Sequence, residues 1–387
     1  MIKAVIVSAV RSAVGRYAGE LSEIEPYKLA GKVIKEAVKR STVDPNDIED
    51  VIMGNLYGQH GNIARVAMLE AGLPETTSAY TLDRQCGSSI ETIHNAAMNI
   101  ELGYGDVYVA CGLEHMTKEP WQLEKTSKPY SIVGPSAMRT RLTPEDDGSD
   151  RVGMTAEKVA KLYKQTPEEL DLFAYNSHKK ATNAINNGYF KDEILPIEVP
   201  VKRGSKIVDQ DENVRMNQEL EDLAKLRPAF IQDGIVTAGN SCPNSDGASA
   251  VVLMSEEKAK ELGVEILATV IGYGVSGLDP SVMGLGPTKA VPKALKRAGI
   301  TIEDVDVMEL NEAFASQVIA SIQDLGIDPS KVNPNGGAIA IGHPLGATGG
   351  VLTAKLVHDM KRRDLRYGVV TMCIGGGQGA ALVLERE

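Results

Sequence analysis

The sequence predicts an α/β protein in which mainly parallel sheets are covered by helices, with two repeated halves and a segment inserted between them. Amphipathic helix patterns alternate with continuous apolar strand patterns near both ends of the chain, which is typical of such sheets. The residues Ile-Glu-Asp-Val occur at 48–51 and again at 302–305, each time after a helix pattern. Residues 119–246 instead carry several prolines, an acidic glycine-containing run and helix signals of their own.

The first half is predicted to comprise residues 1–118 and 247–262. Its second helix pattern is closed by Gly103 and leads directly into an apolar strand that contains Cys111. The expected elements, in order, are a strand at 4–8, helices at 29–40 and 88–102, and strands at 107–113 and 247–255.

The inserted segment, residues 119–246, is predicted to form a loop domain with short helices. Thr-Pro-Glu-Glu at 166–169 is a typical helix start. Connections of this length are usually lids or binding surfaces.

The second half, residues 263–387, repeats the order of the first. A strand at 264–273 is expected to lead to a helix at 288–298 that ends before Gly299, and then to a strand at 305–310. A further helix is expected to begin at His343, followed by a strand at 369–374.

The composition excludes several classes of protein. The chain has 387 residues, 43% of them hydrophobic and 24% charged, which is enough for more than one cored domain. A net charge of −11 argues against a general nucleic-acid binder. No apolar run reaches the roughly 20 residues of a membrane-spanning helix, and no leader peptide is expected, so the protein is predicted to be cytoplasmic.

The four cysteines are expected to be free thiols, because they are sparse and show no CxxC spacing. Cys111 is expected to be structural, although the repeat gives it the position of Cys373 in the other half. The six histidines are dispersed, and no pair has the spacing of metal ligands, so no metal site is expected.

Cys86 is a candidate nucleophile. It lies between an extended stretch and a predicted helix start, where backbone N–H groups would lower the pKa of a thiol. The alternative is a small buried core residue. The position beside Gly87, at a turn from strand to helix, favours the functional interpretation.

His343 is the candidate base. It lies in a run with glycines on both sides, which lets a ligand approach closely, and histidine is the usual partner of a reactive cysteine. The alternative is a packed or capping histidine.

Two further candidate functional residues lie at the end of a predicted strand or directly after one. Cys373 precedes Gly-Gly-Gly at 375–377, whose N–H groups could receive an oxyanion or simply form a tight turn. Asn311 follows the strand at 305–310, where it is either a helix N-cap or an amide that points at a water or substrate oxygen.

One motif misleads. Gly-Tyr-Gly-Val-Ser-Gly at 272–277 matches the dinucleotide fingerprint, but prolines and glycines at 280–287 follow where the fingerprint requires a helix. A dehydrogenase is therefore rejected.

Four motifs together resemble those of the thiolase family, and the resemblance extends over residues 3–385. It implies a five-layered αβαβα fold of two duplicated halves with an inserted loop domain. The motifs are Cys-Gly-Ser at 86–88, Asn-Glu-Ala-Phe-Ala at 311–315, Gly-His-Pro-Leu-Gly at 342–346 and Cys-Ile-Gly-Gly-Gly at 373–377.

The resemblance implies catalytic roles for five residues. Cys86 would take the acyl group as a thioester, His343 would activate Cys86, and Cys373 would move the proton at the acetyl α-carbon. Asn311 would hold a water that binds one thioester oxygen together with His343. The N–H groups of Cys86 and Gly375 would bind the other oxygen.

The resemblance also implies substrate contacts and no cofactor beyond coenzyme A, which is a substrate. Arg215 would lie near the adenine, Phe230 and Ala238 along the pantetheine channel, and Met283 in the acyl pocket. Cys242 stands where the family has a pantetheine-contacting serine, which puts that contact in question. The substrate-binding residues expected are Arg215, Phe230, Ala238, Cys242, Met283 and Phe314.

These features predict an acetyl-CoA C-acyltransferase that cleaves 3-ketoacyl-CoA with CoA or condenses acyl-CoA with acetyl-CoA. Short-chain biosynthetic relatives carry His-Met-Gly before Thr-Ala-Glu, whereas this chain has Arg-Val-Gly-Met at 151–154 before Thr-Ala-Glu, which favours the degradative, β-oxidation type. A strict acetoacetyl-CoA thiolase and a non-catalytic acyl-CoA binder are the alternatives. The expected partners are copies of the same chain, as a homodimer or homotetramer, and a multienzyme β-oxidation partner.

Overall fold

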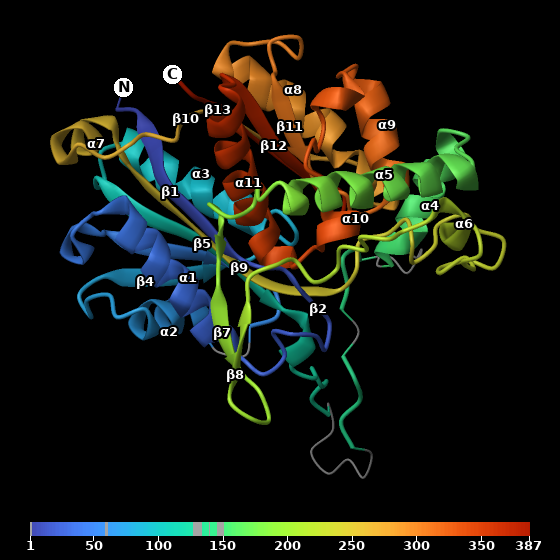
Figure 1. Ribbon diagram of the computed structural model, residues 1–387, viewed down its shortest axis with the longest axis horizontal. Coiled ribbons are helices and arrows are strands. Elements are labelled where there is room, and N and C mark those ends of the chain that lie inside the picture. The colour runs from blue at the N-terminus through green and yellow to red at the C-terminus, as the bar shows by residue number, and fades with distance from the viewer. Residues whose placement is uncertain (1, 59–60, 127–133, 139, 145–150) are drawn as a thin grey trace.

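The computed structural model describes residues 2–58, 61–126, 134–138, 140–144 and 151–387 (Figure 1). Strands of both halves form one continuous hydrogen-bonded array in the order β11-β12-β13-β10-β1-β9-β5-β3-β4. The strands of the first half are β1 (Ala4–Ser12), β3 (Asp50–Gly54), β4 (Ser78–Leu82), β5 (Val107–His115) and β9 (Ser245–Ser255). Those of the second half are β10 (Ala268–Gly277), β11 (Val307–Leu310), β12 (Tyr367–Ile374) and β13 (Gln378–Glu385).

The duplication is visible in the strand pairing. In the first half β9 lies between β1 and β5, and β5 is followed by β3; in the second half β13 lies between β10 and β12, and β12 is followed by β11. The two half-sheets join where β1 pairs with β10, at Val5–Thr269 and Ile6–Ala268.

The prediction of mainly parallel sheets is wrong. β3 pairs in parallel with β4 and β5, and β11 pairs in parallel with β12. β9 and β13, however, run antiparallel to both of their main neighbours. Their continuous apolar runs reflect burial on both faces of the sheet, which does not depend on strand direction.

Helices cover the sheets in three layers, which gives the predicted five-layered αβαβα fold. One core cluster packs α1 (Pro26–Ser41) and α2 (Ile63–Glu70) against the outer face of the first half-sheet. A second cluster contains α3 (Ser88–Glu101) and α11 (Thr348–Arg363), which lie between the half-sheets. A third packs α8 (Gly286–Ala298) and α9 (Ala315–Leu325) against the outer face of the second half-sheet (Figure 1).

The two central helices approach closely near their N-termini. Gly350 N–H donates to the Ser89 hydroxyl at 3.0 Å, and a side chain at Gly349 would collide with the backbone of Ile90. Glycines at this crossing therefore bring the beginnings of α3 and α11 together.

The insertion forms helices and a small hairpin. Its helix α5 (Pro167–Asn186) begins at the predicted position, with a capping box between Thr166 and Glu169. The fully buried guanidinium of Arg11 on β1 anchors the insertion through Glu193 at 2.8 Å and Asp211 at 2.7 Å. The remaining elements of the insertion are α4 (Val152–Leu162), α6 (Leu220–Leu223), β6 (Ile194–Leu195), β7 (Ile197–Pro200) and β8 (Ser205–Val208).

The domain boundaries at 118, 246 and 262 stay predictions.

Short elements complete the described chain. The short elements are β2 (Gly15–Arg16), α7 (Glu256–Leu262), α10 (Ala338–Ile341) and the 3₁₀ helices η1 (Pro45–Asp47), η2 (Met116–Lys118), η3 (Pro280–Leu285), η4 (Pro329–Lys331) and η5 (Leu345–Ala347).

The predicted helix start at His343 is wrong, and the alternative that Asn311 is a helix N-cap is excluded. α11 begins at Thr348 after a separate 3₁₀ turn, so His343 lies five residues before it. α9 begins at Ala315, and its N-cap residue is Phe314 rather than Asn311. Both side chains are therefore on loops and free to carry out other functions.

Candidate active site

Cys86 lies on a tight elbow just before α3. The preceding residue, Gln85, has φ 48, in the left-handed region that non-glycine residues rarely adopt. A side chain at Gly87 would lie 2.5 Å from the side chain of Ile374. The elbow of the first half is therefore packed directly on the end of β12, which belongs to the second half.

Burial raises the pKa of the Cys86 thiol to about 11. It outweighs the backbone N–H groups of Gly375 and of Cys86 itself, which lie near enough to the thiol to lower that pKa. The prediction that the helix start lowers the thiol pKa is therefore wrong in its net effect. Cys86 must pass its proton to a neighbour when it reacts.

His343 is held so that one ring nitrogen is available as a base. The Thr348 hydroxyl donates to the Pro344 carbonyl at 2.9 Å, so its oxygen accepts from His343 Nδ1–H at 2.6 Å. Nε2 then carries a lone pair and lies 3.3 Å from the Asn311 amide nitrogen. Burial lowers the pKa of His343 to about 4, so the ring is neutral near pH 7.

Asn311 follows the end of β11 and is fully buried. Its N–H donates to the Thr371 carbonyl of β12 at 2.9 Å. Within the described residues its side-chain oxygen has no hydrogen-bond partner. A buried acceptor without a protein partner is a site that an ordered water or a ligand can satisfy.

Cys373 is the second-last residue of β12 and is buried. Burial raises the pKa of its thiol, and the nearby Cys86 thiol raises it further. Gly376 and Gly377 adopt φ 82 and 79 in the turn to β13. This turn follows Gly375, whose N–H lies near enough to the Cys86 thiol to lower its pKa.

The sequence repeat predicts that Cys111 is the counterpart of Cys373 in the first half. This prediction is wrong. Glu49 N–H bonds the Val107 carbonyl in the first half in the same way as Asp306 N–H bonds the Tyr367 carbonyl in the second. Counting from these bonds, Leu113 corresponds to Cys373. The position is shifted along the strand because β5 and β12 start at different distances from their preceding helices.

Four of the predicted substrate-binding residues lie in or beside one apolar cluster. Met283, Phe314 and Cys373 are buried in it, and Cys242 packs against it. The ring of Phe230 meets that of Phe314 edge-on at 5.9 Å. Phe230 also covers Gly153, where any side chain would collide with its ring. All four predicted substrate side chains named here are thus brought together with the second thiol.

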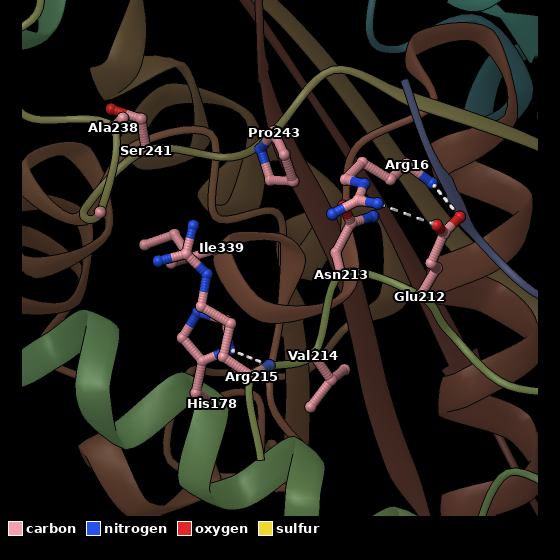
Figure 2. A pocket seen from close by; sticks show the side chains of 11 residues that line it. Arg16, His178, Glu212, Asn213, Val214, Arg215, Ala238, Ser241, Pro243 and Ile339 are labelled. Carbon is pink, nitrogen blue, oxygen red and sulfur yellow. Dashed lines mark hydrogen bonds and ion pairs between the residues drawn. The ribbon is translucent and has the colours of Figure 1, made fainter. Parts of the chain in front are cut away.

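A pocket of about 160 Å³ contains the other two predicted contacts, Arg215 and Ala238 (Figure 2). His178 on α5 accepts the N–H of Arg215 at its Nδ1 atom, at 3.2 Å. Burial, and then Arg215, lower the pKa of His178 to about 4. The remaining lining residues are Arg16, Glu212, Asn213, Val214, Gly239, Ser241, Pro243 and Ile339.

The pocket and the apolar cluster are neighbours. Ser241 and Pro243 line the pocket and flank Cys242, and Ile339 belongs to both. Arg16 and Arg215 give the pocket two guanidinium groups, and the carboxylate of Glu212 lies 3.5 Å from Arg16. A ligand with an anionic end and an apolar tail would match the charged pocket and the apolar cluster beside it.

Sequence reasoning missed the residues that orient His343. Thr348 fixes the ring, and the Ser245 hydroxyl accepts the backbone N–H of His343 at 3.1 Å. Thr348 lies five residues after the histidine, and Ser245 lies in the other half, so no local pattern identifies them. One of the six histidines, His60, lies outside the residues that the structure describes.

Among the residues that the structure describes, no cluster of histidine, cysteine and acidic side chains could hold a metal ion. The same residues include no helix that is long and apolar enough to span a membrane.

Comparison with known proteins gives a consistent result. The family model for the thiolase N-terminal domain matches residues 4–257, and that for the thiolase C-terminal domain matches residues 264–386. The chain is 46% identical to the 3-ketoacyl-CoA thiolase of Bacillus subtilis, with 100% of each chain covered. It is 43% identical to the acetyl-CoA acetyltransferase of Pseudomonas aeruginosa, with 99% of each covered.

Solved structures agree. Human mitochondrial 3-ketoacyl-CoA thiolase is 38% identical and superposes with a TM-score of 0.95, covering 100% of this chain and 99% of the human one. The structure of the same human protein in complex with CoA gives a TM-score of 0.93, with 100% and 98% covered.

Proposed function

The chain belongs to the thiolase family and is an acyltransferase. We propose that it cleaves 3-ketoacyl-CoA with CoA, or runs the reverse condensation, through an acyl thioester on Cys86. The observation that carries the proposal is the packing of the Cys86 elbow on the end of β12, which brings the N–H groups of Cys86 and Gly375 near enough to the Cys86 thiol to lower its pKa. Donors in this place stabilise an oxyanion formed on an acyl group attached to that sulfur.

In the first half-reaction, the Cys86 thiol gives its proton to Nε2 of His343 as the sulfur attacks the thioester carbonyl carbon. The carbon–sulfur bond to CoA then breaks, and the leaving thiolate takes the proton from His343. The neutral ring of His343, with Nδ1–H bonded to Thr348, suits this step.

In the second half-reaction, the Cys373 thiol first gives its proton to Nε2 of His343, and the Cys373 thiolate then takes a proton from the α-carbon of acetyl-CoA. The resulting carbanion attacks the acyl carbonyl on Cys86 and releases the Cys86 thiolate, which takes the proton from His343. Thiolysis is the same path in reverse. The unsatisfied oxygen of Asn311 supports a bound water that, together with the Nε2–H of His343 in its protonated form, would stabilise the enolate oxygen.

For coenzyme A, we propose the pocket of Arg215 and Ala238 as the entrance and the cluster of Met283, Phe314 and Phe230 as the acyl end. Two guanidinium groups at the entrance favour the anionic part of CoA. Cys242, between the two regions, would contact pantetheine through a thiol, which is a weaker hydrogen-bonding group than a hydroxyl.

The degradative type is proposed over a strict acetoacetyl-CoA enzyme, because residues 151–154 lack the histidine of short-chain biosynthetic relatives. Gly153 in this segment leaves room for the ring of Phe230 beside Phe314, so the segment borders the proposed acyl pocket. A non-catalytic acyl-CoA binder is disfavoured because Cys86, His343 and Cys373 are all present.

A homo-oligomer is also proposed. β4 ends the sheet, and its residues are partly or fully exposed, with Tyr80 36% exposed. An edge strand of this kind is available for pairing with a second copy.

The proposed function is tested by a thiolysis assay with purified protein and 3-ketoacyl-CoA substrates of increasing chain length. The degradative type predicts cleavage of substrates longer than acetoacetyl-CoA. Cleavage of acetoacetyl-CoA alone would favour the biosynthetic alternative, and no cleavage of any substrate would contradict the function.

A further inference from the structure

Glu114 is a buried carboxylate to which the mechanism above assigns no role. It lies near the end of β5 and is 1% exposed. Four donors converge on it, two at each oxygen. Oε1 accepts from the Asn55 amide at 3.1 Å and from Tyr57 N–H at 3.2 Å. Oε2 accepts from Leu56 N–H at 3.2 Å and from Gly346 N–H at 3.0 Å.

These donors come from both halves of the molecule. Residues 55–57 form the turn after β3, in the first half, and Cys86 is near enough to the Tyr57 side chain to raise the pKa of that phenol, after the larger effect of burial. Gly346 belongs to the second half and lies three residues after His343. A single carboxylate thus connects a turn beside the nucleophile to the loop that carries the base.

Backbone geometry shows how closely the loop is seated. A side chain at Gly346 would lie 2.6 Å from the Leu113 carbonyl and 2.9 Å from Asn55 Cα. A side chain at Gly112 would lie 2.5 Å from the Gly346 carbonyl. The loop therefore rests directly on the ends of β3 and β5, and Glu114 supplies the polar contacts at that junction.

We propose that Glu114 is a positioning residue that holds the His343-bearing loop of the second half in register with the Cys86 elbow of the first. The proposal rests on the proposed thiolase reaction. Glutamine cannot replace Glu114, because its single oxygen can serve only one of the two donor pairs. Its NH₂ group would face the other pair, donor against donor.

The test compares Glu114→Gln with the wild type at about pH 8.5, well above the Glu114 pKa, which burial raises to about 7. We expect kcat per folded site to fall by on the order of a hundredfold, as for a misplaced catalytic group. KM should be unchanged, because Glu114 does not line the Arg215 pocket. Iodoacetamide should still alkylate Cys86.

Two further variants separate positioning from stability. Asp306→Asn is the matched control. Asp306 also accepts two backbone N–H groups, from Arg366 and Tyr367, but these lie at the start of β12, at the end of the strand far from Cys373. Both N–H groups bond the same oxygen, Oδ2, which an asparagine carbonyl oxygen can replace, so this variant should lose little stability and keep kcat per folded site. Gly346→Ala should lower kcat like Glu114→Gln by lifting the same loop, and the double variant should lose little more than the worse single variant.

The outcomes distinguish the two proposals. A wild-type chain without thiolysis would overturn the function and, with it, this role. An active wild type together with a Glu114→Gln variant of normal kcat per folded site would overturn the role of Glu114 alone. So would a raised KM at normal kcat, or fully additive losses in the double variant. If Glu114→Gln does not fold, Gly346→Ala decides by the same kcat and KM criteria.

Discussion

The two halves of this protein share one topology. They differ in the segments that follow their equivalent strands, β5 and β12. In the first half, β5 continues into a 3₁₀ helix, and its end is occupied by Glu114, which bonds to a loop of the other half. In the second half, β12 ends at Ile374, one residue after Cys373, and continues into a turn that contains Gly375, Gly376 and Gly377. Duplication thus provides the frame, and unequal loops provide different chemistry.

The halves also differ in how they hold their reactive groups. The first half presents one nucleophile on an elbow with an unusual backbone conformation at Gln85. The second half presents a base and an amide on two loops and a second thiol near the end of β12. Neither half contains a complete site, so substitutions in each half should cause distinct losses.

The largest expected loss is at the elbow of the first half. Cys86→Ala should abolish covalent acylation and leave the protein folded, because the change removes only the sulfur atom. Mass spectrometry after mixing with acetyl-CoA checks this, with unchanged thermal unfolding as the control. An acetylated Cys86→Ala protein would show that the nucleophile lies elsewhere.

The next largest loss is expected at the base of the second half. His343→Asn should slow acylation by about a thousandfold, the usual contribution of a positioned general base. Rapid-quench measurement of Cys86 acetylation checks this. Acylation at the wild-type rate would remove His343 from the mechanism.

The same variant tests the pKa of His343. The folded pKa of about 4 lies below the ordinary value of 6.5, so the unfolded chain binds the proton first as the pH falls. This histidine therefore costs stability progressively from about pH 6.5 down to about pH 4. The stability advantage of wild type over His343→Asn should shrink over that range in denaturant unfolding, and a constant difference would contradict the buried, neutral ring.

A smaller loss is expected from the residue that fixes the ring of His343. Thr348→Val removes the acceptor for Nδ1–H, and losing one hydrogen bond of about 1 kcal/mol should slow acylation about fivefold. Thr353→Val is the matched control, since Thr353 is a buried threonine of the same helix that bonds only the Gly349 carbonyl. Equal rates in the two variants would show that the ring needs no such support.

The smallest effect is expected at Cys111, in the strand of the first half that corresponds to β12. It is 1% exposed, and its sulfur approaches only the Val109 carbonyl, at 3.9 Å. Cys111→Ala should keep most of the turnover and lose about 1 kcal/mol of stability. Loss of activity in a folded variant would mean that the halves are less different than their loops indicate.

The sequence is sufficient for the fold class, the repeat and the motif residues, because helix periodicity, glycine stops and the motifs around Cys86 and His343 are local signals. It is insufficient where distant chain segments decide. The antiparallel direction of β9 and β13 depends on connection topology, and an apolar run is the same in either direction.

The site shows the same limit. Thr348, Ser245 and Glu114 lie far from Cys86 in sequence or carry no recognisable pattern, and their functions follow from bonds formed only in the folded chain. The predicted direction of the Cys86 thiol pKa is wrong because the sequence shows the helix start but not the burial around it.

Whether the two halves supply thiols with different tasks can be decided by a pair of measurements on Cys373→Ser. Acetylation of Cys86 by acetyl-CoA, followed by mass spectrometry, should persist, because that step uses only Cys86, His343 and an oxyanion hole. Exchange of the acetyl-CoA α-protons with solvent deuterium, followed by NMR, should be lost, because a serine hydroxyl is far less acidic than a thiol. Intact exchange, or loss of acetylation, would contradict the division of labour between the halves.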